Sequence, residues 1–235
     1  MMKAVINARY GSPDVLEIRQ VPKPEPAVGE VLVRVHATTV SRTDCGMRRP
    51  HPFFVRLGAG IFRPKFTTLG MDFAGVVEAV GAGVTSFQSG SHVFGLSPDT
   101  YGAHAEYLCV PEMGAIAAMP AGRRLLKPAG VFAATDLGPW AQNPLLVLWT
   151  TMTGSRRVIF PLPQSSKARA FVDFLKTRIE AGEFRAVIDR AYSLEAIADA
   201  YRYAETEQKT GIVVINVRSD DGTQDGFQRC VVHGS

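Results

Sequence analysis

Cysteine is scarce in this chain of 235 residues, and the three present, Cys45, Cys109 and Cys230, lie far apart in the sequence. Because no C-x-x-C pair occurs, we expect neither a disulfide framework nor a cysteine-rich zinc site, and a reducing, cytoplasmic setting is the expectation that follows. The first residues lack the apolar stretch of a secretory signal. The most apolar segment, 144–152, is far shorter than the roughly 20 residues that a membrane-spanning helix needs.

Charge of one sign is not concentrated anywhere in the sequence. Lysine and arginine total 26 against 22 aspartates and glutamates, which gives a formal net charge of +4. The arginines form scattered pairs rather than the long basic, aromatic-interleaved runs of nucleic-acid-binding segments. A composition with 46% hydrophobic and 20% charged residues is typical of a globular protein with a packed core. We therefore expect neither nucleic acid nor a membrane as a partner.

A glycine-rich dinucleotide loop is the most informative absence. Such a loop needs a strand, Gly-x-Gly-x-x-Gly and then a helix, so that the backbone can approach a pyrophosphate at the helix N-terminus. The triplet at 81–83 has Ser86 where the third glycine would stand, and a strand-forming segment follows it instead of a helix. The triplet at 58–60 is followed by a proline-containing segment. Neither triplet fits, and the first is predicted to be a turn between two strands.

The first half of the chain is rich in short β-type segments separated by glycine and proline, which is typical of a small barrel or sandwich. The clearest half-buried strand is 30–40, where Val31, Val33 and Val35 are expected on the buried face and Leu32 on the other. Further strands are predicted at 3–10, 15–22, 73–80, 91–96 and 103–111.

After residue 120 the pattern changes to helices and buried-type strands. The best helix prediction is 165–184, which has a serine at its start and a glycine at its end. Phe171, Phe174 and Ile179 recur on it at helical spacing. The other predictions are a helix at 193–208, strands at 131–138, 156–163 and 211–217, and a disordered tail at 218–235.

Several linked segments carry a resemblance to a known family. Segments 8–18, 22–44, 69–95 and 102–112 have the order and spacing of a GroES-like catalytic domain, and the region 121–217 follows the C-terminal end of the same proteins. The chain resembles the medium-chain dehydrogenase/reductase superfamily, and within it the zinc-independent, quinone-oxidoreductase-like branch.

The resemblance implies an α/β (α+β) fold with two parts. A GroES-like β-barrel domain would cover 1–120, with 185–217 returning to it. The segment 121–184 would be a truncated remnant of a Rossmann nucleotide-binding domain, and 218–235 the tail. At about 30 residues per βαβ unit, roughly three units that would include the glycine-rich loop are missing after residue 120. A homodimer that pairs exposed edge strands would be one way to cover such a truncated sheet.

The resemblance also implies an activity, in which NADPH gives a hydride to a small quinone, enone or carbonyl compound. No catalytic residue carries over from the family. Ser41 and Asp44 fall beside the nicotinamide cleft by position, Asp72 replaces the glutamate of the family's metal motif, and these three are the substrate-pocket candidates. Each has a structural alternative, turn capping for the first two and an internally bonded carboxylate for the third. Cofactor contacts are implied for the turns at Thr135, Asp136, Leu137, Gly138, Phe160 and Pro161.

Two departures from the family shape the functional hypothesis. Zinc-dependent members carry cysteine and Gly-His-Glu where this chain has Ser41 and Gly70-Met71-Asp72, and serine and methionine are poor zinc ligands, so no metal is expected. The missing loop predicts impaired NADPH binding. The alternative is therefore a non-catalytic pseudoenzyme that acts as a binding or interaction module. A chaperonin-like cap fits less well, because 121–217 follow the dehydrogenase pattern.

Overall fold

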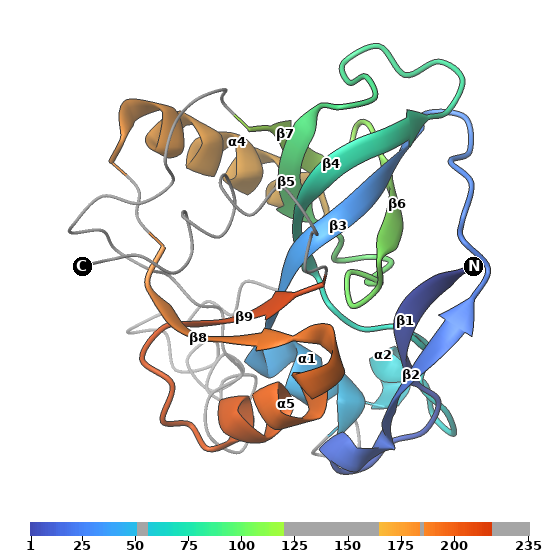
Figure 1. The fold of residues 1–235 in the computed structure, drawn as a ribbon, viewed down its shortest axis with the longest axis vertical. Helices are drawn as coiled ribbons and strands as arrows, with labels where there is room; N and C mark the ends of the chain where they lie inside the picture. The colour runs from blue at the N-terminus through green and yellow to red at the C-terminus, as the bar shows by residue number, and fades with distance from the viewer. Residues whose placement is uncertain (51–55, 120–164, 184–185, 218–235) are drawn as a thin grey trace, which may run out of the picture.

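Residues 1–50, 56–119, 165–183 and 186–217 are described by a computed structural model (Figure 1). Most of their strands form one sheet in the order β7-β5-β4-β3-β9-β8, and β6 also pairs with β3. The strands are β1 (Met2–Asn7), β2 (Leu16–Val21), β3 (Glu30–Val40), β4 (Asp72–Val80), β5 (His92–Leu96), β6 (Tyr107–Pro111), β7 (Ala115–Ala118), β8 (Ile188–Ser193) and β9 (Ile212–Asn216). The helices are α1 (Arg42–Arg48), α2 (Arg56–Ala59), α4 (Ser165–Ala181) and α5 (Ile197–Glu205), with 3-10 turns η1 (Pro13–Val15) and η4 (Leu194–Ala196).

Strand β3 is the centre of this sheet. It pairs with β4 along one edge, while β6 and then β9 pair with successive parts of its other edge. Val31, Val33 and Val35 are fully buried, as predicted. Leu32 is also buried, at 3% exposure, so the prediction of a half-buried strand is wrong at this position. A register shift against β4 follows Leu32, and such a local bend lets both faces of a strand be covered.

The main core lies on the inner face of the sheet and is closed by α5. Ile197, Ala200, Tyr201 and Ala204 recur on one side of α5, and all four are buried in the same cluster as the valines of β3. In the lower part of Figure 1, α5 lies beside α1 and next to β8. The domain division, including the return of 185–217 to the barrel domain, stays a prediction.

Helix α4 covers the outer face of β7 and β5. Gly182, with φ of 73°, follows it directly, as the sequence pattern indicates. Its buried stripe is Ala168 and Val172, which pack against the alanines of β7. Phe171 and Phe174 are exposed by 44% and 53%, so they are not the packing residues that their spacing suggests. Small side chains permit the close approach of a helix to a sheet, and they decide which stripe packs.

Most predicted elements occur within a few residues of their expected bounds, with three differences. The segment predicted as a strand from residue 103 becomes one only at 107, because the backbone of Ala103 and His104 bonds to the loop at Leu69 and Gly70 instead. The helix predicted at 193–208 is divided into η4 and α5, and the Ser193 side chain makes no capping hydrogen bond. Strands β7 and β8 and helix α1 were not predicted. The segments predicted at 131–138, 156–163 and 218–235 lie outside the described residues.

The glycine-rich triplet at 81–83 is a turn between β4 and β5, which confirms the prediction. Gly83 has a φ of 83°, and no other atom lies closer than 4.0 Å to where its Cβ would be. A Cβ on Gly81 would lie 1.8 Å from the carbonyl oxygen of Ala27. The glycine at 81 is therefore required by packing against the chain's own backbone.

We expect Gly81→Ala to lower the free energy of unfolding by about 1–3 kcal/mol, the usual range for forced overpacking. Gly83→Ala is the matched control, because it meets no backbone and should cost only the roughly 1 kcal/mol of a left-handed alanine. Urea denaturation of both variants measures the difference. Equal losses would contradict the assignment of Gly81 to a packing contact.

Candidate functional site

Four side chains form a row across the outer face of the sheet, on the side of α4. Asp72 is paired with Leu96, and Leu96 with Ala115, across β4, β5 and β7. Thr39, on β3, donates a hydrogen bond from its hydroxyl group to the Asp72 carboxylate. Paired residues on neighbouring strands face the same side of a sheet, so Thr39, Asp72, Leu96 and Ala115 share one surface, which we call the outer row.

Asp72 is the titratable group of the outer row and is half-buried. Burial raises its pKa to about 6; the hydrogen bond from Thr39 opposes the shift, the negative charge of Asp44 adds to it, and the positive charge of Lys209 lowers it. A carboxyl group with this pKa can hold a proton at a pH where an ordinary aspartate has lost it. It can thus act as a general acid or base near neutral pH.

Ser41 and Asp44 have a structural role at the start of α1. The Ser41 hydroxyl group accepts a hydrogen bond from the Asp44 N–H, and the Asp44 carboxylate accepts one from the Ser41 N–H at 2.9 Å, which is a capping box. The other Asp44 oxygen accepts from the N–H of Gly70 at 3.1 Å. The neighbouring Cys45 is packed against the core, and burial raises its pKa to about 12. A substrate role for Ser41 or Asp44 stays a prediction.

His104 is part of the site although the sequence reasoning did not select it. Its side chain is fully buried, and its Nε2 lies 3.0 Å from the carbonyl oxygen of Thr39, which requires that Nε2 carry the hydrogen. Burial lowers the pKa of His104, and the Asp44 charge and the bond to Thr39 offset only part of this effect. The imidazole is thus neutral at pH 7 and holds the backbone at Thr39. His104 stands between Ala103 and Ala105, and no local pattern in the sequence indicates that its side chain is buried.

We expect His104 to make the fold sensitive to acid. The unfolded chain binds a proton on this residue near pH 6.5 and the folded chain does not, so its contribution to stability is lost as pH falls below about 6.5, by up to about 1.4 kcal/mol per pH unit. His104→Gln keeps a donor toward Thr39 but cannot titrate. Urea denaturation between pH 5 and 8 gives the free energy of unfolding of the natural chain and of His104→Gln. The difference between these two free energies should become smaller toward low pH. A constant difference would contradict the prediction.

The remaining predicted site residues, Thr135, Asp136, Leu137, Gly138, Phe160 and Pro161, lie outside the described part of the chain. Within that part, no three histidine, cysteine, aspartate or glutamate side chains come together as a metal site would require. The described glycine turn does not fit a pyrophosphate, because the Ala27 carbonyl occupies the space beside Gly81. None of the helices described is long and apolar enough to cross a membrane.

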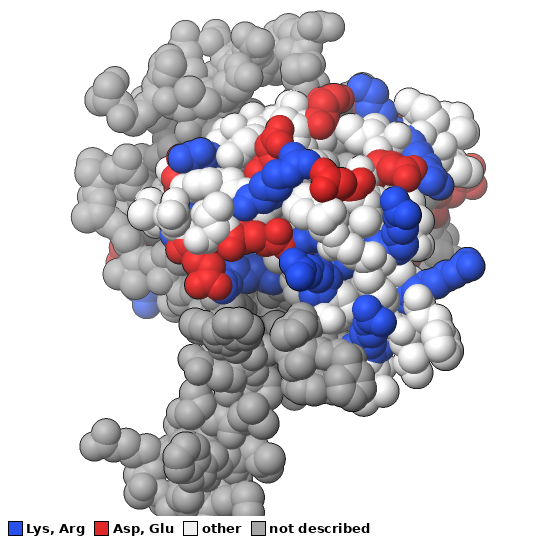
Figure 2. All heavy atoms as spheres, turned by 90° about the horizontal axis from the view of Figure 1, so that it is seen from below, with Lys and Arg blue, Asp and Glu red and all other residues white. Residues whose placement is uncertain are grey.

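The surface charge of the described residues is mixed. On the face shown in Figure 2, acidic and basic side chains are interspersed without an extended patch of one sign. Exposed ion pairs also join opposite charges: Arg202 on α5 pairs with Asp199 and with Asp14, and Lys3 pairs with Glu195. Such a face offers no continuous track for a phosphate backbone.

Two family models match the chain, and they give the same family. The alcohol dehydrogenase GroES-like domain matches residues 27–121, and the zinc-binding dehydrogenase domain matches 109–215. The quinone oxidoreductases of Sus scrofa and Homo sapiens are each 37% identical to it over 109 residues, which cover 46% of this chain. The chain belongs to the quinone-oxidoreductase-like branch of the medium-chain dehydrogenase/reductase superfamily.

The curated relatives of this medium-chain dehydrogenase/reductase are longer than the matching region. The chain spans 30% of the length of the pig and human quinone oxidoreductases. Among solved structures, the quinone oxidoreductase from Coxiella burnetii superposes with a TM-score of 0.72, and the match covers 92% of this chain and 99% of that one. At 17% sequence identity, this likeness shows the fold alone. The predicted family and the α/β fold with a GroES-like domain are confirmed.

Proposed function

We propose that this chain is an NADPH-dependent oxidoreductase that reduces a small quinone, enone or carbonyl compound by hydride transfer. The observation that carries the proposal is Asp72 on the outer row, a half-buried carboxyl group with a pKa of about 6 beside the hydroxyl group of Thr39. By the family resemblance Asp72 is a substrate-pocket candidate. Reduction of a carbonyl group adds a hydride and a proton, and Asp72 is suited to hold that proton.

The residues around Asp72 have positioning roles in this proposal. His104 fixes the carbonyl of Thr39, and the Thr39 hydroxyl group orients the carboxyl group of Asp72. Thr38 donates to the Asp72 carbonyl at 2.7 Å and fixes the backbone of the same residue. A carboxyl group held in this way can present its proton to an oxygen on which negative charge develops. The nicotinamide cofactor supplies the hydride when it is bound.

The described residues do not fit the pyrophosphate half of such a cofactor, so no step is derived through it. We expect weak binding, because the helix-end phosphate site is the main charged contact of dinucleotides in this superfamily. The same observation favours the second candidate function, a non-catalytic binding or interaction module. A cytoplasmic setting and a homodimer that pairs exposed edge strands are further parts of the proposal, and light scattering checks the dimer.

An NADPH titration of the purified full chain, followed by cofactor fluorescence, tests the proposed function. Weak but saturable binding below millimolar NADPH, followed by quinone-dependent oxidation of NADPH, is the expected result. A parallel titration with NADH tests the preference for the phosphorylated cofactor. Absence of binding up to millimolar NADPH would overturn the enzyme proposal and favour the interaction module.

A further inference from the structure

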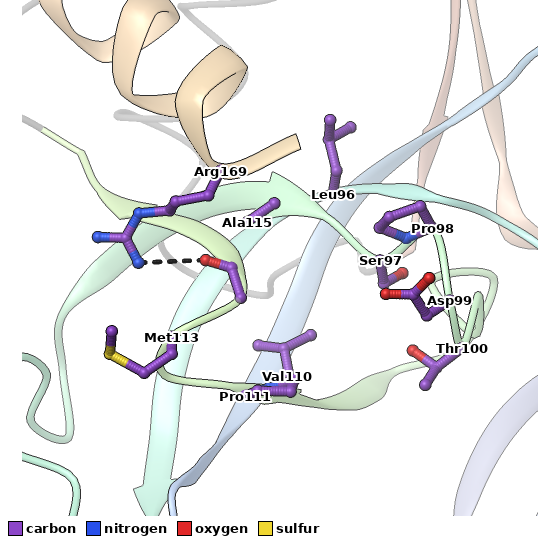
Figure 3. Close-up of a pocket in the computed structure, with 11 residues that line it drawn as sticks. Leu96, Ser97, Pro98, Asp99, Thr100, Val110, Pro111, Met113, Ala115 and Arg169 are labelled. Atoms are coloured by element: carbon purple, nitrogen blue, oxygen red, sulfur yellow. Dashed lines mark hydrogen bonds between the residues drawn. The ribbon is translucent and has the colours of Figure 1, made fainter. Parts of the chain in front are cut away.

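A cavity of about 390 Å³ lies beside the outer row, between β5, β6, β7 and α4 (Figure 3). Leu96 and Ala115 of the outer row belong to its lining. Val110, Pro111 and Met113 add further apolar wall, and the loop after β5 contributes Asp99 and Thr100. Cavities of this size with mostly apolar walls and a few polar groups are typical of small-molecule sites.

The two charged groups of this cavity differ in how they are compensated. The Arg169 guanidinium donates to the carbonyls of Glu112 and Gly114, at 3.2 and 3.1 Å, and pairs with the Asp173 carboxylate. Its charge is thus neutralised outside the cavity. The Asp99 carboxylate lies on the opposite side in Figure 3 and is exposed, and no hydrogen bond or ion pair joins it to another residue in the described part of the chain.

This arrangement has a clear preference for one kind of ligand. A carboxylate without a partner attracts a cation or a hydrogen-bond donor and repels an anion, whereas the compensated Arg169 offers little to an anion. Leu96, Val110 and Met113 provide apolar contact for an uncharged body. A ligand that combines a cationic hydrogen-bond donor with an apolar body is an amphipathic amine.

We propose that this cavity binds a small amphipathic amine, with its apolar body against Leu96, Val110 and Met113 and its ammonium group at Asp99. The inference goes beyond the proposed function and does not depend on it, because binding here requires neither a cofactor nor turnover. For a ligand of about ten heavy atoms we expect a Kd on the order of 1 mM. The ammonium group should tighten binding about threefold to tenfold over a neutral end, as expected for a charge pair near the surface.

The test is a chemical-shift titration of the isotope-labelled full chain with phenethylamine and with phenethyl alcohol, its neutral analogue. We expect saturable shifts at the backbone amides of Ser97, Asp99 and Thr100 and of residues 113–115, with tighter binding of the amine. In the Asp99→Asn variant, the affinity for the amine should fall to that for the alcohol. The affinity for the alcohol should not change. Met113→Ala, at an 82% exposed side chain whose loss should not affect folding, should weaken both ligands equally.

Glu25→Gln is the matched control, because it removes one exposed negative charge away from the cavity lining. It should change neither affinity. The proposal is overturned if neither probe binds, if the shifts occur elsewhere in the chain, or if Asp99→Asn retains the preference for the amine. Failure of NADPH binding would leave all of these results unaffected, so the two proposals can be separated.

Discussion

Glu205→Ala is expected to lower the free energy of unfolding by about 3–5 kcal/mol, because it leaves a buried guanidinium group without its counter-charge. The side chain of Arg48 has no exposed surface. It donates to the Glu205 carboxylate and to the carbonyl of Gly11, and it lies over the ring of Tyr201 at 5.4 Å. These contacts connect α1 to α5 and to the loop before η1. Thermal or urea denaturation measures the loss.

The chain offers a matched control for this prediction. Glu207 pairs with Arg42 at 2.5 Å, but its side chain is 53% exposed, so Glu207→Ala should cost no more than about 1 kcal/mol. The double variant Arg48→Met with Glu205→Ala should recover most of the loss, since it removes both charges and keeps an apolar side chain in the core. If Glu205→Ala cost as little as Glu207→Ala, the Arg48 pair would not be an important part of the fold.

Asp72→Asn is expected to stabilise the fold at pH 7, by up to about 3 kcal/mol. The pKa of Asp72 rises from 3.8 to about 6 on folding, so at neutral pH the folded chain carries an ionised group that burial disfavours. Asparagine has no charge to desolvate and can still accept the hydrogen bond from Thr39. Urea denaturation of the variant and of the natural chain at pH 7 gives the difference.

The pH dependence of this difference has a definite sign. Between pH 4 and 6 the folded chain binds more protons at Asp72 than the unfolded chain, so the natural protein loses stability as pH rises through this window. The advantage of Asp72→Asn should therefore be small near pH 4 and reach its full value above pH 6. An advantage that does not change with pH would show that Asp72 is not the cause.

The same substitution tests the role of Asp72 in the proposed reaction. Loss of a positioned proton donor should lower turnover by about a hundredfold or more while leaving NADPH affinity unchanged. Glu25→Gln, an exposed change of the same kind, should affect neither quantity. A variant more stable but less active than the natural chain would indicate that stability is sacrificed for function at this site.

Local sequence patterns predicted a large part of the fold. The alternation in 30–40, the glycine turn at 81–83 and the two C-terminal helices each depend on a few neighbouring residues, and their positions are close to those expected. Linked motifs also predicted the family, because the order and spacing of the remaining motifs are kept in this chain although single motifs differ from the family pattern. Leu32 and Phe174 show the limit of this reasoning, since a periodic pattern does not say which neighbour will cover a face.

The sequence by itself predicted most of the elements and the family. Only the tertiary structure decided that Asp72, Thr39 and Leu96 share one surface, and that His104 is buried beneath it. The physical reason is that burial and hydrogen bonding of a polar side chain depend on strands tens of residues away. The periodicity of a sequence indicates which side of a strand is apolar. The pKa of Asp72 depends instead on the residues that the folded chain places around it.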